Sequence, residues 1–159
     1  MRRLVLTLLA CLFVAPGAAA AAMRGPGDGT LVVKNANATK IVVEGRGAIF
    51  GHFETGTLTV VDYNPFDTKD PQMNGCVRTQ QKSDTTTVCK GGDVRFYFSG
   101  GKYKLILSGF DISLSAVGKG TVSLAGQGTT DDGTFAVNGG KPQALPPYLP
   151  TVATFGNNP

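Results

Sequence analysis

Apolar and polar side chains alternate along several segments of this 159-residue chain. Val94, Phe96 and Phe98 alternate with Arg95 and Tyr97, and threonines alternate in the same way with leucine and valine over residues 57–60. This period of two is typical of antiparallel sheets with one buried face and one face in water. The chain also contains 22 glycines, which favour tight turns, and we find no helical periodicity after residue 22. The sequence therefore predicts an all-β fold.

The expected domain covers residues 23–145. We predict a single antiparallel β-sandwich or squat barrel of about eight to ten short strands. The alternative is a short β-solenoid, because the first expected strands begin at nearly even spacing, close to residues 30, 40, 48 and 57.

Residues 30–62 align with residues 94–126 without a gap. The offset of 64 residues matches Lys40 with Lys104 and Gly56 with Gly120, and the apolar positions also correspond. We interpret this match as an internal duplication, with chance similarity of two β-rich segments as the alternative. In this frame the only histidine, His52, corresponds to Ala116, so we expect a half-buried packing side chain there.

Residues 1–22 have the pattern of a secretory signal peptide. Arg2 and Arg3 precede an apolar run, and small residues follow it over residues 18–22. A lipidated Cys11 is the alternative, but the apolar run continues past that residue. No later segment approaches the roughly 20 apolar residues that a membrane-spanning helix needs. We therefore expect a mature protein that does not span a membrane and is secreted, periplasmic or at the cell surface.

Removal of the signal peptide would leave two cysteines, Cys76 and Cys89. A pair of thiols in an oxidising compartment predicts a disulfide. It would also leave 13 basic and 11 acidic side chains, a balance that argues against nucleic-acid binding. We expect residues 63–92 to form a long loop held by the disulfide, and residues 146–159 to form an extended or disordered tail containing proline and asparagine.

The candidate binding residues are basic or aromatic side chains on the predicted polar sheet face or in the stapled loop. They are Tyr63, Phe66, Arg95, Tyr97, Lys102 and Lys104. Lysines on a sheet edge are also an ordinary protection against aggregation, and aromatic residues are more often part of a core. An anionic envelope polymer or an extracellular protein is the partner that this set would suit.

Catalytic groups are scarce. No pair of carboxylates is reliably brought together by the spacing of Glu44 and Glu54, and Asp131–Asp132–Gly133 is a turn signature before it is a calcium loop. We assign no catalytic residue, metal or cofactor. The sequence favours an exported non-enzymatic domain that binds an envelope component or an extracellular partner. A structural or self-assembling surface protein is the alternative, and a hydrolase using His52 or Glu54 is a third possibility.

Overall fold

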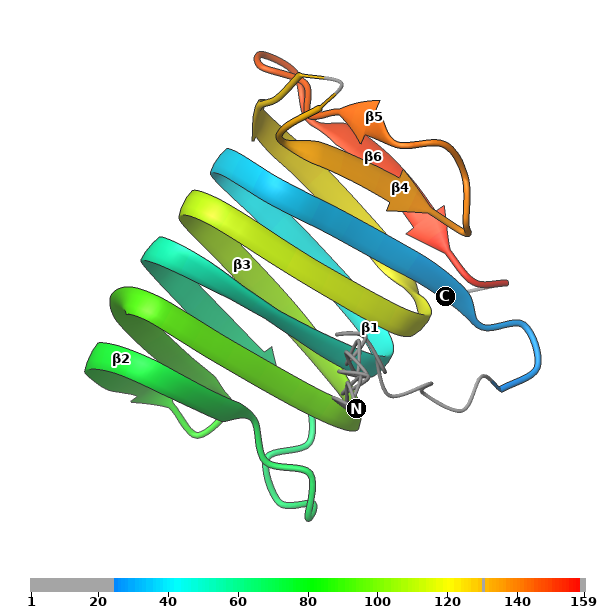
Figure 1. The fold of residues 1–159 in the computed structure, drawn as a ribbon. Helices are drawn as coiled ribbons and strands as arrows, with labels where there is room; N and C mark the ends of the chain where they lie inside the picture. The colour runs from blue at the N-terminus through cyan, green and yellow to red at the C-terminus, as the bar shows by residue number, and fades with distance from the viewer. Residues whose placement is uncertain (1–24, 130, 158–159) are drawn as a thin grey trace, which may run out of the picture.

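The structure is a computed structural model that describes residues 25–129 and 131–157, so the expected signal peptide over residues 1–22 and Cys11 lie outside the described residues. Six strands and no helix are present in the described part of the chain (Figure 1). The strands are β1 (Gly29–Asp62), β2 (Gln72–Ser83), β3 (Thr86–Gln127), β4 (Thr134–Val137), β5 (Gln143–Ala144) and β6 (Thr151–Phe155). All strand pairs are antiparallel. The predicted all-β antiparallel fold is confirmed.

The two longest strands, β1 and β3, are wound around each other as a coiled ribbon. Val43 of β1 pairs with both Leu105 and Val122 of β3, which are 17 residues apart in the chain. The middle of β1 therefore lies between two successive passes of β3, and the ribbon hydrogen-bonds to its own next turn (Figure 1). The remaining strands extend this single sheet in the order β2-β3-β1-β4-β5, with β6 paired to β3.

The coil is flattened into two walls that pack face to face (Figure 1). The His52 wall contains residues 30–35, 48–54, 93–98 and 111–117, and the Lys104 wall contains residues 41–46, 57–62, 102–108 and 119–125. The inward side chains of both walls form one core that includes Phe53 and Phe98 from the first wall and Leu105 and Leu124 from the second. This is the sandwich form of the prediction, and the sheet is not closed into a barrel. The strands are fewer and longer than expected because their pairing continues around the corners.

Glycines occupy the corners between the two walls. Gly47 pairs with Gly101 on one side and Gly118 on the other, so three glycines stack on successive passes of the ribbon. A Cβ added at Gly118, whose φ is +149°, would lie 2.0 Å from the carbonyl oxygen of Arg46. The backbones at this corner are therefore too close for any side chain directed between them.

The alternation that the sequence predicts is confirmed within each wall. Val94, Phe96 and Phe98 are buried, whereas Arg95 and Tyr97 are exposed. The predicted inward residues Leu58 and Val60 on β1 are also buried, as are Val122 and Leu124 on β3.

The expected packing role of His52 is wrong. His52 and Phe50 are exposed, and the inward positions are Ile49 and Phe53. On β3 the inward positions change from odd to even numbers between Leu107 and Ile112, around a corner where Asp111 has a φ of +49°. β1 makes no such change between Val43 and Phe53. The 64-residue alignment applied the inward and outward positions of β3 to β1, and for this reason it wrongly predicted an inward His52. The duplication itself stays a prediction.

The disulfide between Cys76 and Cys89 is confirmed, with a Cα–Cα distance of 5.4 Å. The expected long loop is different from the prediction, because Gln72–Ser83 forms β2 and pairs with the start of β3. The disulfide therefore joins an edge strand to its neighbour, and Cys89 lies in the core.

The C-terminal segment also differs from the prediction of a disordered tail. Residues 151–155 form β6, which pairs with residues 120–124 of β3, and Phe155 is buried. Leu145 is buried as well, so the segment closes the core at this end of the coil. Residues 25–129 and 131–157 include no helix of the length and apolarity needed to cross a membrane.

We expect Gly118→Ala to lower the free energy of unfolding by about 2–4 kcal/mol, because its methyl group must displace the backbone at the corner. Gly139→Ala is the matched control, since Gly139 also has a positive φ of +72° but has open space around it. Its free energy of unfolding should fall by only about 1 kcal/mol, which is the cost of a side chain at a positive φ. Urea unfolding followed by circular dichroism measures both changes. Equal losses in the two variants would contradict the close corner packing.

Reduction of the disulfide should lower the free energy of unfolding by about 3 kcal/mol, because the unfolded chain regains the freedom of a short closed loop. Urea unfolding with and without a reductant measures this effect. In the Cys76→Ala/Cys89→Ala variant the reductant should change nothing. An unchanged midpoint in the reduced parent protein would show that the bond does not constrain the unfolded state.

Candidate functional site

The six candidate binding residues do not form one site. Tyr63, Lys102 and Lys104 lie together at the Lys104 wall, whereas Arg95 and Tyr97 lie on the outer face of the His52 wall. Phe66 lies in the connection between β1 and β2, in the turn that follows Tyr63, and is 88% exposed. The molecule therefore presents two separate surfaces.

The first surface is organised by hydrogen bonds around Glu44. The Tyr63 hydroxyl donates to Glu44 Oε1 at 2.8 Å, and Lys104 Nζ lies 3.4 Å from Glu44 Oε2. Lys102 Nζ lies 4.6 Å from the centroid of the Tyr63 ring, in a cation–π arrangement. The hydrogen bond from Tyr63, followed by the nearby lysines, lowers the pKa of Glu44, and the same bond raises the pKa of Tyr63.

The connection that carries Tyr63 is fixed from the core side. The buried Tyr103 hydroxyl donates a hydrogen bond to the backbone carbonyl of Lys69. Burial, with smaller contributions from nearby aspartates, raises the pKa of Tyr103 to about 12. The Tyr63 backbone N–H also donates to the Lys102 carbonyl at 3.2 Å. The aromatic ring is thus held beside the basic residues.

Three cations form a column at the glycine corner of this wall. Arg46 pairs with Lys102 on one side and Lys119 on the other, so Lys102, Arg46 and Lys119 lie on successive passes of the ribbon. We call these three residues the basic corner. Neighbouring passes of a sheet are about 4.8 Å apart. Lys102 and Arg46 are exposed, and no carboxylate in the described residues forms an ion pair with any of the three.

Sequence reasoning identified only Lys102 of the basic corner. The missed residues are Arg46 and Lys119, which are far from Lys102 in the chain. A local signal exists, because each cation directly follows a glycine, in Gly45–Arg46–Gly47, Gly101–Lys102 and Gly118–Lys119–Gly120. The sequence alone shows a cation beside each corner glycine. It does not show the strand pairing that places the three cations next to one another.

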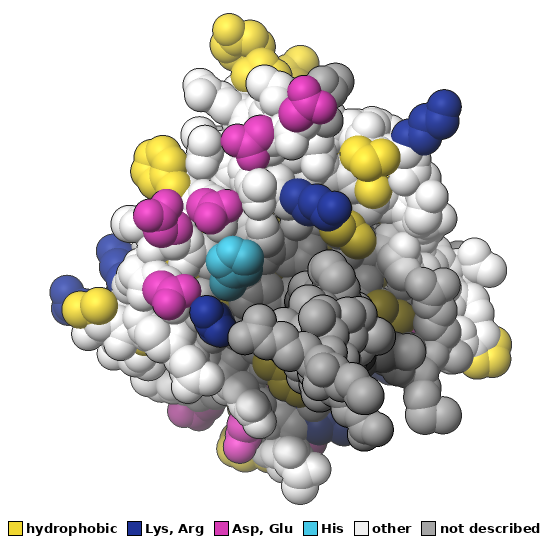
Figure 2. All heavy atoms as spheres, viewed as in Figure 1, with side chains coloured by type: hydrophobic (Ala, Val, Ile, Leu, Met, Phe, Trp, Pro, Cys, Tyr) yellow, Lys and Arg dark blue, Asp and Glu magenta, His cyan; other side chains and the backbone are white. Residues whose placement is uncertain are grey.

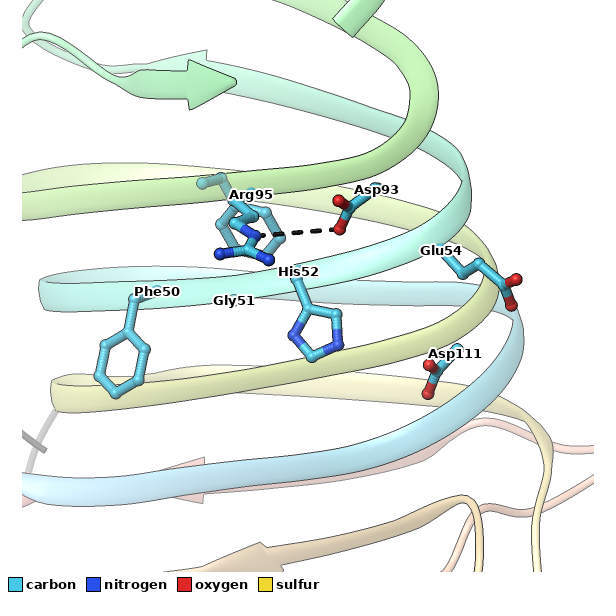
Figure 3. Close-up of a pocket in the computed structure, with 8 residues that line it drawn as sticks. Phe50, Gly51, His52, Glu54, Asp93, Arg95 and Asp111 are labelled. Atoms are coloured by element: carbon cyan, nitrogen blue, oxygen red, sulfur yellow. Dashed lines mark ion pairs between the residues drawn. The ribbon is translucent and has the colours of Figure 1, made fainter. Parts of the chain in front are cut away.

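The second surface is a shallow groove of about 460 Å³ on the His52 wall. Figure 3 shows its lining, which includes Phe50, His52 and Arg95 together with Glu54, Asp93 and Asp111. The register of the neighbouring residues places the three carboxylates on successive passes of the ribbon, in the order Asp93, Glu54, Asp111. We call these three residues the acidic corner. Figure 2 shows acidic side chains gathered beside the histidine at the left edge of this wall.

The acidic corner is only weakly neutralised within the chain. Arg95 Nε lies 3.8 Å from Asp93 Oδ1, and both side chains are more than 75% exposed, with 76% for Arg95 and 79% for Asp93. An exposed ion pair of this length contributes little. Asp93 and Asp111 both have a φ of +49°, a conformation that aspartate and asparagine tolerate better than most residues.

His52 is the one side chain of the groove, among the described residues, that could serve as an imidazole base. Within residues 25–129 and 131–157, His52 has no side-chain hydrogen bond to a carboxylate that would orient it as a base. The same residues include no group of three His, Cys, Asp or Glu side chains arranged to hold a metal ion. At the Asp131–Asp132 turn, the Thr129 hydroxyl oxygen accepts hydrogen bonds from the backbone N–H groups of both aspartates.

Comparison with known proteins gives no functional lead, because no protein-family model, curated protein or solved structure matches the chain.

We expect Tyr63→Phe to raise the pKa of Glu44 towards its ordinary value, because the variant removes the hydrogen bond that lowers it most. An NMR titration of the Glu44 carboxyl carbon measures this change. Because the folded pKa is below the unfolded one, the contribution of this carboxylate to stability is present above the unfolded pKa. It is lost as the pH falls through the folded pKa, and Tyr63→Phe should reduce this pH dependence. Tyr97→Phe on the other wall is the control. An unchanged pKa of Glu44 in Tyr63→Phe would contradict the hydrogen bond between Tyr63 and Glu44.

Proposed function

We propose that this chain is an exported, non-enzymatic β-domain that binds an anionic polymer of the cell envelope along the basic corner. The observation that carries the proposal is the stacking of Lys102, Arg46 and Lys119 on successive passes of one ribbon. The signal-peptide pattern of residues 1–22 supports export, and a disulfide is compatible with an oxidising compartment.

Electrostatics favour a polyanion at this corner. Like charges placed directly opposite each other on neighbouring strands destabilise a sheet. Three cations in one column therefore repel one another, and the nearby carboxylate of Glu44 is already paired with Lys104. A ligand with several negative groups along its length would remove the repulsion at all three positions.

The shape of the surface favours a chain rather than a small anion. Lys102 and Arg46 are exposed on a corner and not enclosed in a cavity, so a single small anion would keep most of its contact with water. A polymer lying along the column would contact each cation in turn. The Tyr63 ring, which is 45% exposed beside Lys102, adds an apolar contact for the polymer backbone.

Dextran sulfate is a suitable probe, with neutral dextran of the same length as its control. The protein should bind the sulfated polymer only, and binding should weaken as salt screens the charges. Arg46→Gln/Lys102→Gln/Lys119→Gln should weaken binding by at least about tenfold, since each lost contact contributes a modest amount. Fluorescence anisotropy of labelled polymer measures the affinity.

A second triple variant separates position from net charge. Lys40→Gln/Lys90→Gln/Lys141→Gln removes the same charge from exposed lysines elsewhere. It should bind dextran sulfate nearly as well as the parent protein. Equal loss in the two triple variants would show that only net charge matters, and the proposed site would then be wrong.

A further inference from the structure

The basic and acidic corners are two ends of the same three passes of the ribbon. β3 runs from Asp93 to Lys102 and later from Asp111 to Lys119, and between these passes β1 runs from Arg46 to Glu54. Each pass crosses the His52 wall and carries a cation at one edge and a carboxylate at the other. The two columns therefore have the same number of charges, the same spacing and the same order along the coil.

The neighbouring passes do not continue the acidic column. On the next pass beyond Asp93, β2 has Gly75 near this corner, and on the pass beyond Asp111 the nearby residues are Asn35 and Asn37. The acidic column therefore ends after three passes, whereas Lys69, whose Nζ donates to the Gly100 carbonyl at 3.2 Å, lies near the Lys102 end of the basic column. A translated copy of this chain would place three cations against three carboxylates.

Each corner also carries an exposed aromatic ring. Phe110, next to Asp111, is 62% exposed, and Tyr63, beside Lys102, is 45% exposed. Aromatic side chains at the centre of a contact and charged groups around them are typical of protein interfaces. Repulsion within each column would be relieved by the opposite column of a second copy.

We propose that the acidic corner of one copy binds the basic corner of a second copy, so that the chains associate side by side. The contact joins two different surfaces, so each bound copy still offers one free corner of each kind. Association of this type adds further copies in the same direction and is not limited to a dimer. It does not depend on the polymer binding proposed above, although both use the basic corner and must compete for it.

The ends of the coil are less suited to association than its sides. β2 is an edge strand, but its pairing is irregular at three places and it carries Arg78 and Lys82. Bulges and cations of this kind oppose pairing with a further strand. The other end is covered by β4, β5 and β6, with Phe135, Leu145 and Phe155 buried beneath them.

Two complementary variants test the proposal. The first, Glu54→Gln/Asp93→Asn/Asp111→Asn, neutralises the acidic corner, and asparagine suits the positive φ at both aspartates. The second, Arg46→Gln/Lys102→Gln/Lys119→Gln, neutralises the basic corner. Sedimentation velocity over a range of concentrations should show the oxidised parent protein growing into species larger than a dimer at low salt. It should return to a monomer at high salt, because exposed ion pairs are screened.

Each variant alone should bind itself on the order of tenfold or more weakly than the parent protein does. It should therefore be a monomer at concentrations where the parent protein associates. An equal mixture of the two should form a one-to-one dimer and nothing larger, because only one competent pair of corners remains. A parent protein that is monomeric at every concentration and salt would overturn the proposal. So would association of either variant with itself at the parent's strength.

Dextran sulfate distinguishes this proposal from the polymer-binding function. The acidic-corner variant should bind the polymer like the parent protein while failing to self-associate, and added polymer should disperse the parent assemblies. Self-association without polymer binding would overturn only the proposed function. Polymer binding by a parent protein that never self-associates would overturn only the present inference.

Discussion

The pairing of one long strand with two passes of another determines this structure. β1 has β3 as its neighbour on both edges through most of its length, so its backbone hydrogen bonds are satisfied only when the ribbon is coiled. The coil in turn creates the two walls, the enclosed core and the corners. Charges that are separated by more than fifty residues in the chain become direct neighbours for this reason, as Arg46 and Lys102 do. Both charged columns are products of the winding.

The sequence was sufficient to predict the inner and outer faces wherever a strand stays within one wall. Val94, Phe96 and Phe98 were all assigned correctly, because a buried face imposes a strict period of two. The corners could not be predicted in the same way. An additional residue near Asp111 changes the phase of the alternation, and its effect depends on backbone geometry that side-chain polarity does not encode. The error at His52 followed directly from this.

The candidate site was predicted in part for a related reason. Lys102, Lys104 and Tyr63 were recognised as basic or aromatic residues on polar positions, and the structure brings them together with Glu44. Arg46 and Lys119 were missed because their place beside Lys102 depends on the register between passes. The regular spacing of the corner glycines also bears on the duplication, which stays a prediction. Gly47 and Gly56, like Gly109 and Gly118, are nine residues apart, so a chain with such corners matches itself at several offsets.

The long-range pairing of β1 also affects when the chain can fold. Residues 29–62 have almost no strand partner until residues 86–127 have been synthesised, because their ladders are formed with β3. Folds that depend on such distant contacts form slowly, since a long loop must close before any pairing is gained. Most of the chain must therefore be complete before the coil can close. A polypeptide with this order of contacts gains its two walls and its core together, only after β3 has been made.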